Sequence, residues 1–216
     1  MCGRYTIAKS RQVLGALLRR EVSEDVIAPV YNASPGQRLP VILDREPERV
    51  VPALWGFRTD AGRLAGRLLI NARAETVHDK PLFRDAFRRR RCLVIADGFY
   101  EWQKRADGKQ PFRITLRDDR LFAFAGLWMT RNRAPVFLIL TTDPNGVTGP
   151  IHDRMPVILE EREQASWLER ELPTDEVRRL LDRHPEGEMT AYPVSRAVND
   201  SRNEGPELIE PLAVQR

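Results

Sequence analysis

The sequence has none of the long apolar stretches that a membrane protein or a secreted precursor carries. Its apolar runs, such as Val136 to Leu140, are far shorter than the roughly 20 residues that span a bilayer. The first residues, Met1 to Thr6, contain no apolar segment of the signal-peptide type. These two absences predict a cytoplasmic protein with no membrane partner.

Cysteine is scarce, with only Cys2 and Cys92 in 216 residues. A chain of this length buries enough apolar surface to fold without disulfides, and the cytosol would reduce a single bridge. We therefore expect two free thiols. Because Cys92 opens an apolar run, we expect it to be a small residue of the hydrophobic core.

The motifs that hold metals and nucleotide cofactors are also missing. The sequence has no Cys-x-x-Cys, no histidines four residues apart, no glycine-rich phosphate loop ending in Lys-Ser/Thr and no Gly-x-Gly-x-x-Gly. We therefore expect neither a metal nor an organic cofactor. His78, His152 and His184 are the only histidines, so few groups can serve as a general acid or base near neutral pH.

Lysine is rare although the chain is basic, with a formal net charge of +4 and a pI near 9.4. Of the 35 basic residues only Lys9, Lys80, Lys104 and Lys109 are lysines, which leaves 31 arginines. Arginine suits bidentate contacts with phosphate, but most charged side chains simply form a solvated surface. The charge therefore permits a nucleic-acid partner without establishing one.

Helices are predicted near both ends of the chain. Ser10 is suited to cap a helix that runs to Leu18, and Asp79 to cap a helix over Pro81 to Arg90. The arginine run 88–91 ends the second helix, because cationic side chains complement the C-terminal end of the helix dipole. Two short helices are expected over 161–171 and 174–183.

Strands are predicted mainly in the middle of the chain, where apolar runs alternate with turn residues. The expected strands are residues 39–43, 50–57, 93–102, 111–116, 121–128 and 136–142, followed by an extended segment at 191–194. Strands grouped between helices favour an α+β fold of mainly antiparallel sheets. With no linker or repeat in the sequence, residues 1–216 are expected to form a single domain.

Cys2 is the residue with the most specific chemistry. If Met1 is removed, Cys2 carries a free α-amine next to its thiol. An α-amine titrates at about 8, so a useful fraction is neutral at physiological pH and can form a Schiff base with an aldehyde. The adjacent thiol can then close a five-membered thiazolidine ring, which proximity favours. Most cysteines at a second position are ordinary terminal residues, so this chemistry needs support from other motifs.

Several motifs supply that support. Residues 1–4 are Met-Cys-Gly-Arg, residues 71–75 Asn-Ala-Arg-Ala-Glu, residues 98–102 Gly-Phe-Tyr-Glu-Trp and residues 152–156 His-Asp-Arg-Met-Pro. In this order they resemble the SOS response-associated peptidase family, also called abasic site processing proteins, and the resemblance covers essentially the whole chain. It implies a barrel-like fold with peripheral helices. It also implies a protein of the DNA damage response that shields abasic sites in single-stranded DNA through a covalent crosslink.

The resemblance implies a role for each residue that matches a catalytic motif. Cys2 would form the thiazolidine crosslink. Glu101 would shuttle protons, a task that suits a carboxyl group whose pKa is raised by desolvation between aromatic neighbours. His152 would assist opening of the sugar ring, and Asn71 would hydrogen-bond near the reacting amine or the sugar.

The same resemblance implies a DNA-binding surface. Three arginines beside the catalytic motifs would bind phosphates on either side of the lesion: Arg4, Arg73 and Arg154. Trp55 and Gly56 match a segment that lines the DNA channel, where Trp55 would stack on an unpaired base and Gly56 would permit close approach of the backbone. A core position at the end of a strand is an equal alternative for Trp55. Two further residues in matching segments are assigned to this surface, Asn32 and Thr141.

Two other functions are compatible with these residues. A thiol peptidase or N-terminal-nucleophile hydrolase would use Cys2 to form an acyl-enzyme, and self-cleavage of this kind would remove Met1. A non-covalent single-strand binder would use arginines and aromatics alone. Arginines beside the catalytic motifs favour DNA, since a peptide needs no phosphate contacts. We therefore expect a monomeric abasic-site crosslinking enzyme, with lyase activity as a further activity and no replication partner identified.

Overall fold

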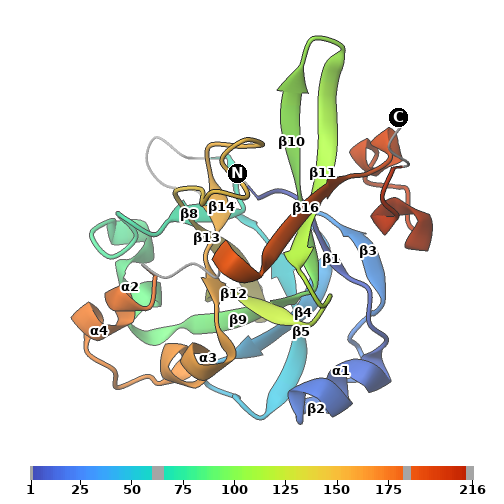
Figure 1. Cartoon of the computed structure of the whole chain (residues 1–216). Helices are drawn as coiled ribbons and strands as arrows, with labels where there is room; N and C mark the ends of the chain where they lie inside the picture. Colours follow the sequence, from blue (N-terminus) through green and yellow to red (C-terminus); the bar gives the residue numbers. More distant parts are fainter. Residues whose placement is uncertain (1, 60–65, 182–185, 213–216) are drawn as a thin grey trace.

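The structure, a computed structural model, describes residues 2–59, 66–181 and 186–212. Its centre is a closed five-stranded barrel made of β4 (Arg38–Leu43), β5 (Arg49–Trp55), β9 (Arg91–Ala96), β12 (Phe122–Arg131) and β13 (Ala134–Thr142) (Figure 1). Antiparallel pairs join the strands in turn, and a parallel pairing of β13 with β5 closes the ring. The predicted α+β class with mainly antiparallel sheets is confirmed.

Aromatic side chains pack in the core of this barrel. Trp55 is stacked on Phe137 with ring centroids 6.2 Å apart, and Tyr5 meets Trp55 edge-on at 5.1 Å. Such pairs add about 0.5–1.5 kcal/mol each beyond the burial of their surface. The indole N–H of Trp55 donates to the Ile70 carbonyl oxygen at 3.1 Å, which satisfies its only polar atom.

A second sheet carries the N-terminal segment. Its strand order is β16 (Met189–Pro193), β11 (Gly108–Leu116), β10 (Gly98–Arg105), β1 (Tyr5–Ile7) and β3 (Val30–Ala33). β1 is antiparallel to β10 with Tyr5 opposite Phe99, so the residues before Tyr5 run along the second half of β10. β10 and β11 extend beyond the sheet as a hairpin that projects from the body of the molecule (Figure 1).

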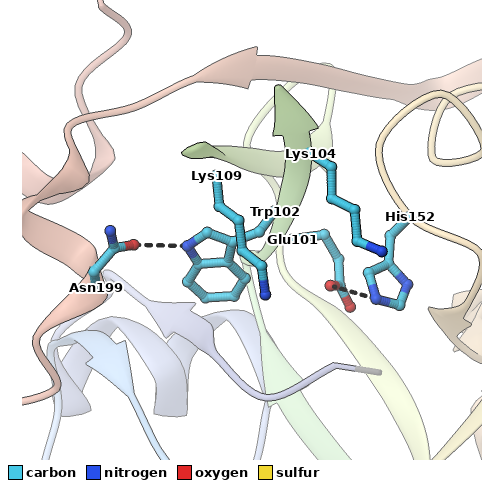
Figure 2. A pocket seen from close by; sticks show the side chains of 6 residues that line it. All are labelled: Glu101, Trp102, Lys104, Lys109, His152 and Asn199. Atoms are coloured by element: carbon cyan, nitrogen blue, oxygen red, sulfur yellow. Dashed lines mark hydrogen bonds and ion pairs between the residues drawn. The ribbon is translucent and has the colours of Figure 1, made fainter. Parts of the chain in front are cut away.

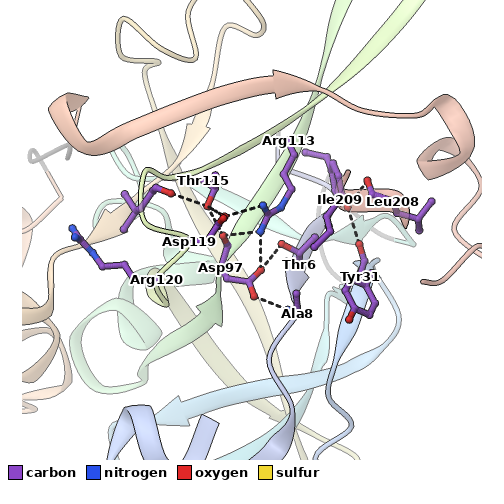
Figure 3. A network of polar contacts seen from close by, with 12 residues as sticks. Thr6, Ala8, Tyr31, Asp97, Arg113, Thr115, Asp119, Arg120, Leu208 and Ile209 are labelled. Carbon is purple, nitrogen blue, oxygen red and sulfur yellow. Dashed lines mark hydrogen bonds and ion pairs between the residues drawn. The ribbon is translucent and has the colours of Figure 1, made fainter. Parts of the chain in front are cut away.

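The expected strand 93–102 is two strands, because Asp97 interrupts it between β9 and β10. The buried Asp97 carboxylate accepts hydrogen bonds from Thr6 Oγ1 and from the Ala8 N–H, both at 2.6 Å. Arg113 Nη2 donates to the same carboxylate at 3.3 Å, and the side chains of this ion pair are 3% and 1% exposed (Figure 3). A buried charge needs such partners. The network ties barrel strand β9 to β1 and β11 of the second sheet.

The first two predicted helices are present. α1 (Arg11–Leu18) is capped by Ser10, whose side chain accepts a hydrogen bond from the Val13 N–H at 3.4 Å. α2 spans Pro81–Arg89, but the prediction that Asp79 caps it is wrong, because Lys80 occupies the N-cap position. The helix begins at Pro81, as the sequence pattern indicates, and only the capping residue differs.

The arginine run after α2 has the structural role expected for it. Arg91 is buried, and its Nη1 donates to the carbonyl oxygens of Phe87 and Arg88 at 2.9 and 2.7 Å. Its Nε donates to the Trp167 carbonyl oxygen at 2.7 Å. Carbonyl groups in the last turn of a helix have no partner within the helix. Arg91 therefore joins the end of α2 to the barrel and to α3 (Glu161–Leu168).

The remaining elements are short. α3 and α4 (Thr174–Arg179) end earlier than the predicted 171 and 183, and Arg183 and His184 lie outside the described residues. The other strands are β2 (Glu21–Val22), β6 (Phe57–Arg58), β7 (Leu68–Leu69), β8 (Asn71–Arg73), β14 (Met155–Pro156) and β15 (Ile158–Leu159). Short 3-10 helices are η2 (Glu186–Glu188), η3 (Arg196–Asn199) and η4 (Pro206–Ile209). No described helix is long and apolar enough to cross a membrane.

Candidate functional site

A cleft of about 430 Å³ opens beside the β10–β11 hairpin. Its lining consists of Glu101, Trp102 and Lys104 from β10, Lys109 from β11, His152 from the loop between β13 and β14, and Asn199 from η3 (Figure 2). Two of the four predicted catalytic residues, Glu101 and His152, therefore face one cavity although they are far apart in the sequence.

Cys2 is buried next to this cleft. The side chain of Asn71, in β8, donates from Nδ2 to the Cys2 carbonyl oxygen at 2.8 Å, and Cys2 Sγ lies 3.9 Å from the Arg4 carbonyl oxygen. Burial, followed by the negative charge of Glu101, raises the pKa of the Cys2 thiol well above its usual range. The thiol is therefore protonated at neutral pH. Cys92 is also free and buried in the core, as predicted.

Glu101 is a carboxylic acid in an environment that disfavours its charge. The side chain is 2% exposed, and burial raises its pKa from 4.5 to about 7. The nearby carboxylate of Asp153 acts in the same direction. Near neutral pH, Glu101 can therefore both accept and donate a proton, which agrees with the role predicted for it.

His152 is held in a defined orientation. Its Nδ1 accepts a hydrogen bond from the Arg154 N–H at 3.1 Å, so the neutral ring carries its proton on Nε2. Nε2 lies 3.7 Å from Oε2 of Glu101. Asp153 Oδ1 is also 3.0 Å from Nδ1, but a backbone N–H can only donate, which fixes Nδ1 as the acceptor. Partial burial lowers the pKa of His152 below its usual value.

Asn71 retains hydrogen-bonding capacity. Its Nδ2 is engaged with Cys2, whereas its Oδ1 is buried and accepts no hydrogen bond from the residues that the structure describes. An acceptor beside Cys2 suits a group with N–H or O–H protons, such as an amine. Cys2, Asn71, Glu101 and His152 thus form one cluster, which we call the catalytic cluster.

The predicted DNA-binding residues divide into buried and exposed ones. Asn32 is buried, and its Nδ2 donates to the carbonyl oxygens of Asp200 and Asn203 at 3.0 and 2.9 Å. Its Oδ1 accepts from Arg4 Nη1 at 2.6 Å, and the same Arg4 nitrogen donates to the Val198 carbonyl oxygen at 2.8 Å. The assignment of Asn32 to the DNA surface is therefore corrected: it anchors Arg4 and the C-terminal segment.

Arg154 and Thr141 also differ from the expectation. Arg154 donates to Asp143 at 2.6 Å, to Glu75 at 2.9 Å and to the Thr141 carbonyl oxygen at 2.6 Å, so two carboxylates already neutralise it. Thr141 is 1% exposed, which rules out its assigned contact with DNA in this conformation. Arg73 alone of the three predicted phosphate-binding arginines is exposed.

Trp55 and Gly56 are both buried, and for Trp55 this agrees with the core alternative rather than with stacking on a base. Trp55 is 0% exposed because Phe137 and Tyr5 cover its ring. Gly56 is buried with φ +89°, and a Cβ there would lie 2.9 Å from Ile70 Cγ2, so packing between strands requires this glycine.

Trp102 is the aromatic residue that sequence reasoning missed. It lines the cleft, partly exposed, and its Nε1 donates to Asn199 Oδ1 at 2.7 Å (Figure 2). Its place next to Glu101, in the Gly-Phe-Tyr-Glu-Trp motif at 98–102, was the signal that could have identified it. Within the described ranges, no group of three His, Cys, Asp or Glu side chains could hold a metal ion.

Comparison with known proteins shows which family has this arrangement of residues. The profile of the SOS response associated peptidase (SRAP) family matches residues 1–201. The chain belongs to the SRAP family. The abasic site processing protein YoqW of Bacillus subtilis (strain 168) is 39% identical to it over 97% of this chain and 99% of its own. The abasic site processing protein YedK of Escherichia coli (strain K12) is 31% identical over 98% and 100% of the two chains.

A solved structure of a Bacteroides thetaiotaomicron protein has the same SRAP-like architecture. It superposes with a TM-score of 0.84 at 26% identity, covering 98% of this chain and all of the other. Every residue of the catalytic cluster and of the cleft lies within the range that the SRAP profile matches.

Proposed function

We propose that this SRAP protein processes abasic sites in single-stranded DNA by forming a covalent bond with the lesion through Cys2, after Met1 has been removed. The observation that carries the proposal is the catalytic cluster, in which a buried carboxyl group with a pKa of about 7 lies beside Cys2. The names of the relatives, abasic site processing proteins, support the same substrate.

The proposed reaction joins Cys2 to the aldehyde of the ring-opened deoxyribose. The neutral α-amine attacks the aldehyde carbon and gives a carbinolamine, which loses water to form an imine. Sγ then bonds to the imine carbon while the thiol proton passes to nitrogen, closing a thiazolidine. One water molecule leaves and nothing is oxidised or reduced, so no cofactor is needed.

The cluster supplies the proton transfers that this sequence requires. Glu101 takes a proton from the α-amine and returns one to the carbinolamine hydroxyl, which must leave as water. His152, with its proton on Nε2, donates to the sugar oxygen during ring opening. Asn71 Oδ1 accepts a hydrogen bond from the amine and orients it.

The protonated thiol supports an amine-first order. A thiol peptidase needs a thiolate on Cys2 as the attacking group, whereas burial raises the pKa of this thiol well above its usual range. The α-amine attacks in its neutral form, which burial favours. We therefore rank peptidase activity second, with self-removal of Met1 as the reaction in which it would appear. Strand cleavage by lyase chemistry would arise if the imine eliminated the 3′ phosphate before the thiol closed the ring.

The DNA strand is proposed to lie along the cleft. Trp102 offers a partly exposed aromatic face on which a base can stack. Arg73, exposed at the end of β8, offers a phosphate contact on the Asn71 side of the cluster. The stacking contact on Trp102 needs an unpaired base, which supports single-stranded DNA as the substrate.

Intact-protein mass spectrometry tests the proposal. The chain is incubated with a single-stranded oligonucleotide carrying one abasic site, beside an undamaged strand of the same sequence. We expect an adduct that survives heating, weighs protein plus oligonucleotide minus one water, and forms only when Cys2 is the first residue. Cys2→Ala should abolish it, while the matched control Cys92→Ala should retain it. Loss of Met1 without any adduct would overturn the proposal and favour the peptidase.

A further inference from the structure

Two of the four lysines of this chain face each other across the β10–β11 hairpin. Lys104 and Lys109 are directly paired in the antiparallel register, so their side chains lie on the same face of the hairpin. Both are exposed and both line the cleft (Figure 2). Trp102 belongs to the same face, two residues before Lys104 in β10. We call Lys104 and Lys109 the lysine pair.

The lysine pair carries positive charge that the protein itself does not neutralise. Like charges directly opposite each other in a sheet are destabilising, and within residues 2–59, 66–181 and 186–212 neither ammonium group takes part in an ion pair. Two arginines near the cleft, in contrast, are occupied by carboxylates. Arg154 is bound to two carboxylates, and Arg196 donates to Asp107 at 2.5 Å.

The hairpin that presents the lysine pair is fixed on both sides. On one side Asp107, at its tip, is bound by Arg196 of η3, and Trp102 is bound by Asn199 of the same helix. On the other side Gln103 Nε2 donates to the Pro150 carbonyl oxygen at 3.1 Å, in the loop that carries His152. The backbone that positions the two lysines therefore has contacts to both walls of the cleft, which lowers the entropy lost when a ligand binds.

We propose that Lys104 and Lys109 together bind one phosphodiester group of the DNA strand next to the lesion. This inference rests on the proposed function, because it assigns the part of the strand that continues past the catalytic cluster. Side chains directly opposite in an antiparallel pair have Cβ atoms about 5 Å apart, so two ammonium groups can converge on one phosphate. The contact carries no base preference, which suits a protein that must act on lesions in any sequence.

Lysine acetylation gives a direct test, because the chain has only four lysines. The intact protein is treated with an acetylating reagent with and without an undamaged single-stranded oligonucleotide, and the sites are read by peptide mass spectrometry. We expect bound DNA to slow modification of Lys104 and Lys109 at least fivefold and to leave Lys9 and Lys80 unchanged. Uniform protection of all four lysines would overturn the inference. Equal protection of Lys104 and Lys109 by inorganic phosphate would also overturn the inference, because the lysine pair would then bind any anion rather than the DNA strand.

A salt titration with matched variants gives a second test. Lys104→Gln/Lys109→Gln and Lys9→Gln/Lys80→Gln remove the same charge from the same protein. For single strands, each phosphate contact contributes about 0.7 to the slope of log K against log salt. We expect the first variant to bind an undamaged strand about tenfold more weakly at low salt and to lose about 0.7 of slope, and the second to match wild type. Equal effects of both variants would overturn the inference.

The two tests also separate this inference from the proposed function. Both use an undamaged strand, so they report on the lysine pair even if no covalent adduct ever forms. Failure of adduct formation with intact protection of Lys104 and Lys109 would remove the crosslinking proposal and keep the phosphate contact. Adduct formation without protection of Lys104 and Lys109 would remove the phosphate contact and keep the crosslinking proposal. Melting curves of the two variants provide the control for folding.

Discussion

Nε2 of His152 lies 3.7 Å from Oε2 of Glu101, and burial shifts the pKa values of the two groups in opposite directions. Burial raises the pKa of Glu101 to about 7, and burial lowers the pKa of His152 below its usual value. Glu101 can therefore change protonation near neutral pH, where the neutral form of His152 is favoured. Paired groups of this kind serve as the acid and the base of a reaction that needs several proton transfers.

Replacing Glu101 with Gln should slow adduct formation at saturating DNA by about 100-fold or more, since general acid–base catalysis contributes about 10² to 10⁴. The wild-type rate should rise with pH through about 7, as the Glu101 carboxyl ionises, with a second rise as the α-amine loses its proton. The variant should keep only the second. Rates measured by gel-resolved adduct formation between pH 5.5 and 9 check this, with the exposed Glu161→Gln as control. An unchanged rate would return Glu101 to a structural role.

The same substitution should make the protein more stable at alkaline pH. The folded state holds a proton on Glu101 up to pH of about 7, whereas the unfolded chain releases it near 4.5. The free energy of unfolding therefore falls as pH rises through this interval, by an amount on the order of 3 kcal/mol for a shift of this size. Glu101→Gln lacks this loss. Urea denaturation at pH 5 and pH 8 should show the variant gaining stability relative to wild type only at pH 8.

Both cysteines should react slowly with iodoacetamide in the folded protein. Each side chain is buried, and burial raises the pKa of both thiols well above the usual range. At pH 7 we expect labelling at least about 100-fold slower than in urea, where the thiols have ordinary pKa values. A Cys92→Ala variant assigns the remaining label to Cys2. Rapid labelling of Cys2 in the folded chain would reveal a thiolate and would favour peptidase activity over the crosslinking reaction.

The motifs predicted the catalytic cluster because each occupies a local position that the backbone imposes. Glu101 is in a strand beside an aromatic core, and the N-terminal segment pairs with that strand through Tyr5 and Phe99. Asn71 and His152 stand at the beginning of β8 and after the end of β13, which pair in parallel along Ile139 to Thr141. The resemblance of these motifs to the SRAP family was what grouped the four side chains, because residue types and spacing alone also fit structural roles.

Burial of individual side chains was not predictable in the same way. Trp55 and Thr141 are buried because β13 pairs with β5 and β8, and these parallel contacts join segments separated by more than sixty residues. Asn32 is buried by the segment around Asp200 and Asn203. Periodicity reports on local structure only. It cannot show which face of a strand a distant segment will cover.

The two tryptophans should give opposite results on replacement. Trp55→Leu should lose about 3 kcal/mol of stability, as for other large-to-small changes in a packed core, and leave affinity for single-stranded DNA within about twofold. Trp102→Leu should leave stability nearly unchanged and weaken binding about tenfold, because base stacking on an aromatic is worth about 1–3 kcal/mol. Urea denaturation and fluorescence anisotropy check both. Weaker DNA binding by folded Trp55→Leu alone would place the strand elsewhere.

Arg73 and Arg154 should likewise behave differently, although both were predicted to bind phosphate. Arg73 is exposed, so Arg73→Ala should weaken binding of all sequences alike and lower the salt slope by about 0.7, the contribution of one phosphate contact on a single strand. Arg154→Ala leaves Glu75 and Asp143 without their shared cation, so it should lower the melting temperature and change the slope less. Anisotropy titrations with two unrelated strands at several salt concentrations check both. A sequence-selective loss with Arg73→Ala would contradict this division, because a phosphate contact does not depend on the base sequence. An equal change of slope with Arg154→Ala would also contradict it, because a guanidinium already neutralised by carboxylates does not displace counterions from DNA.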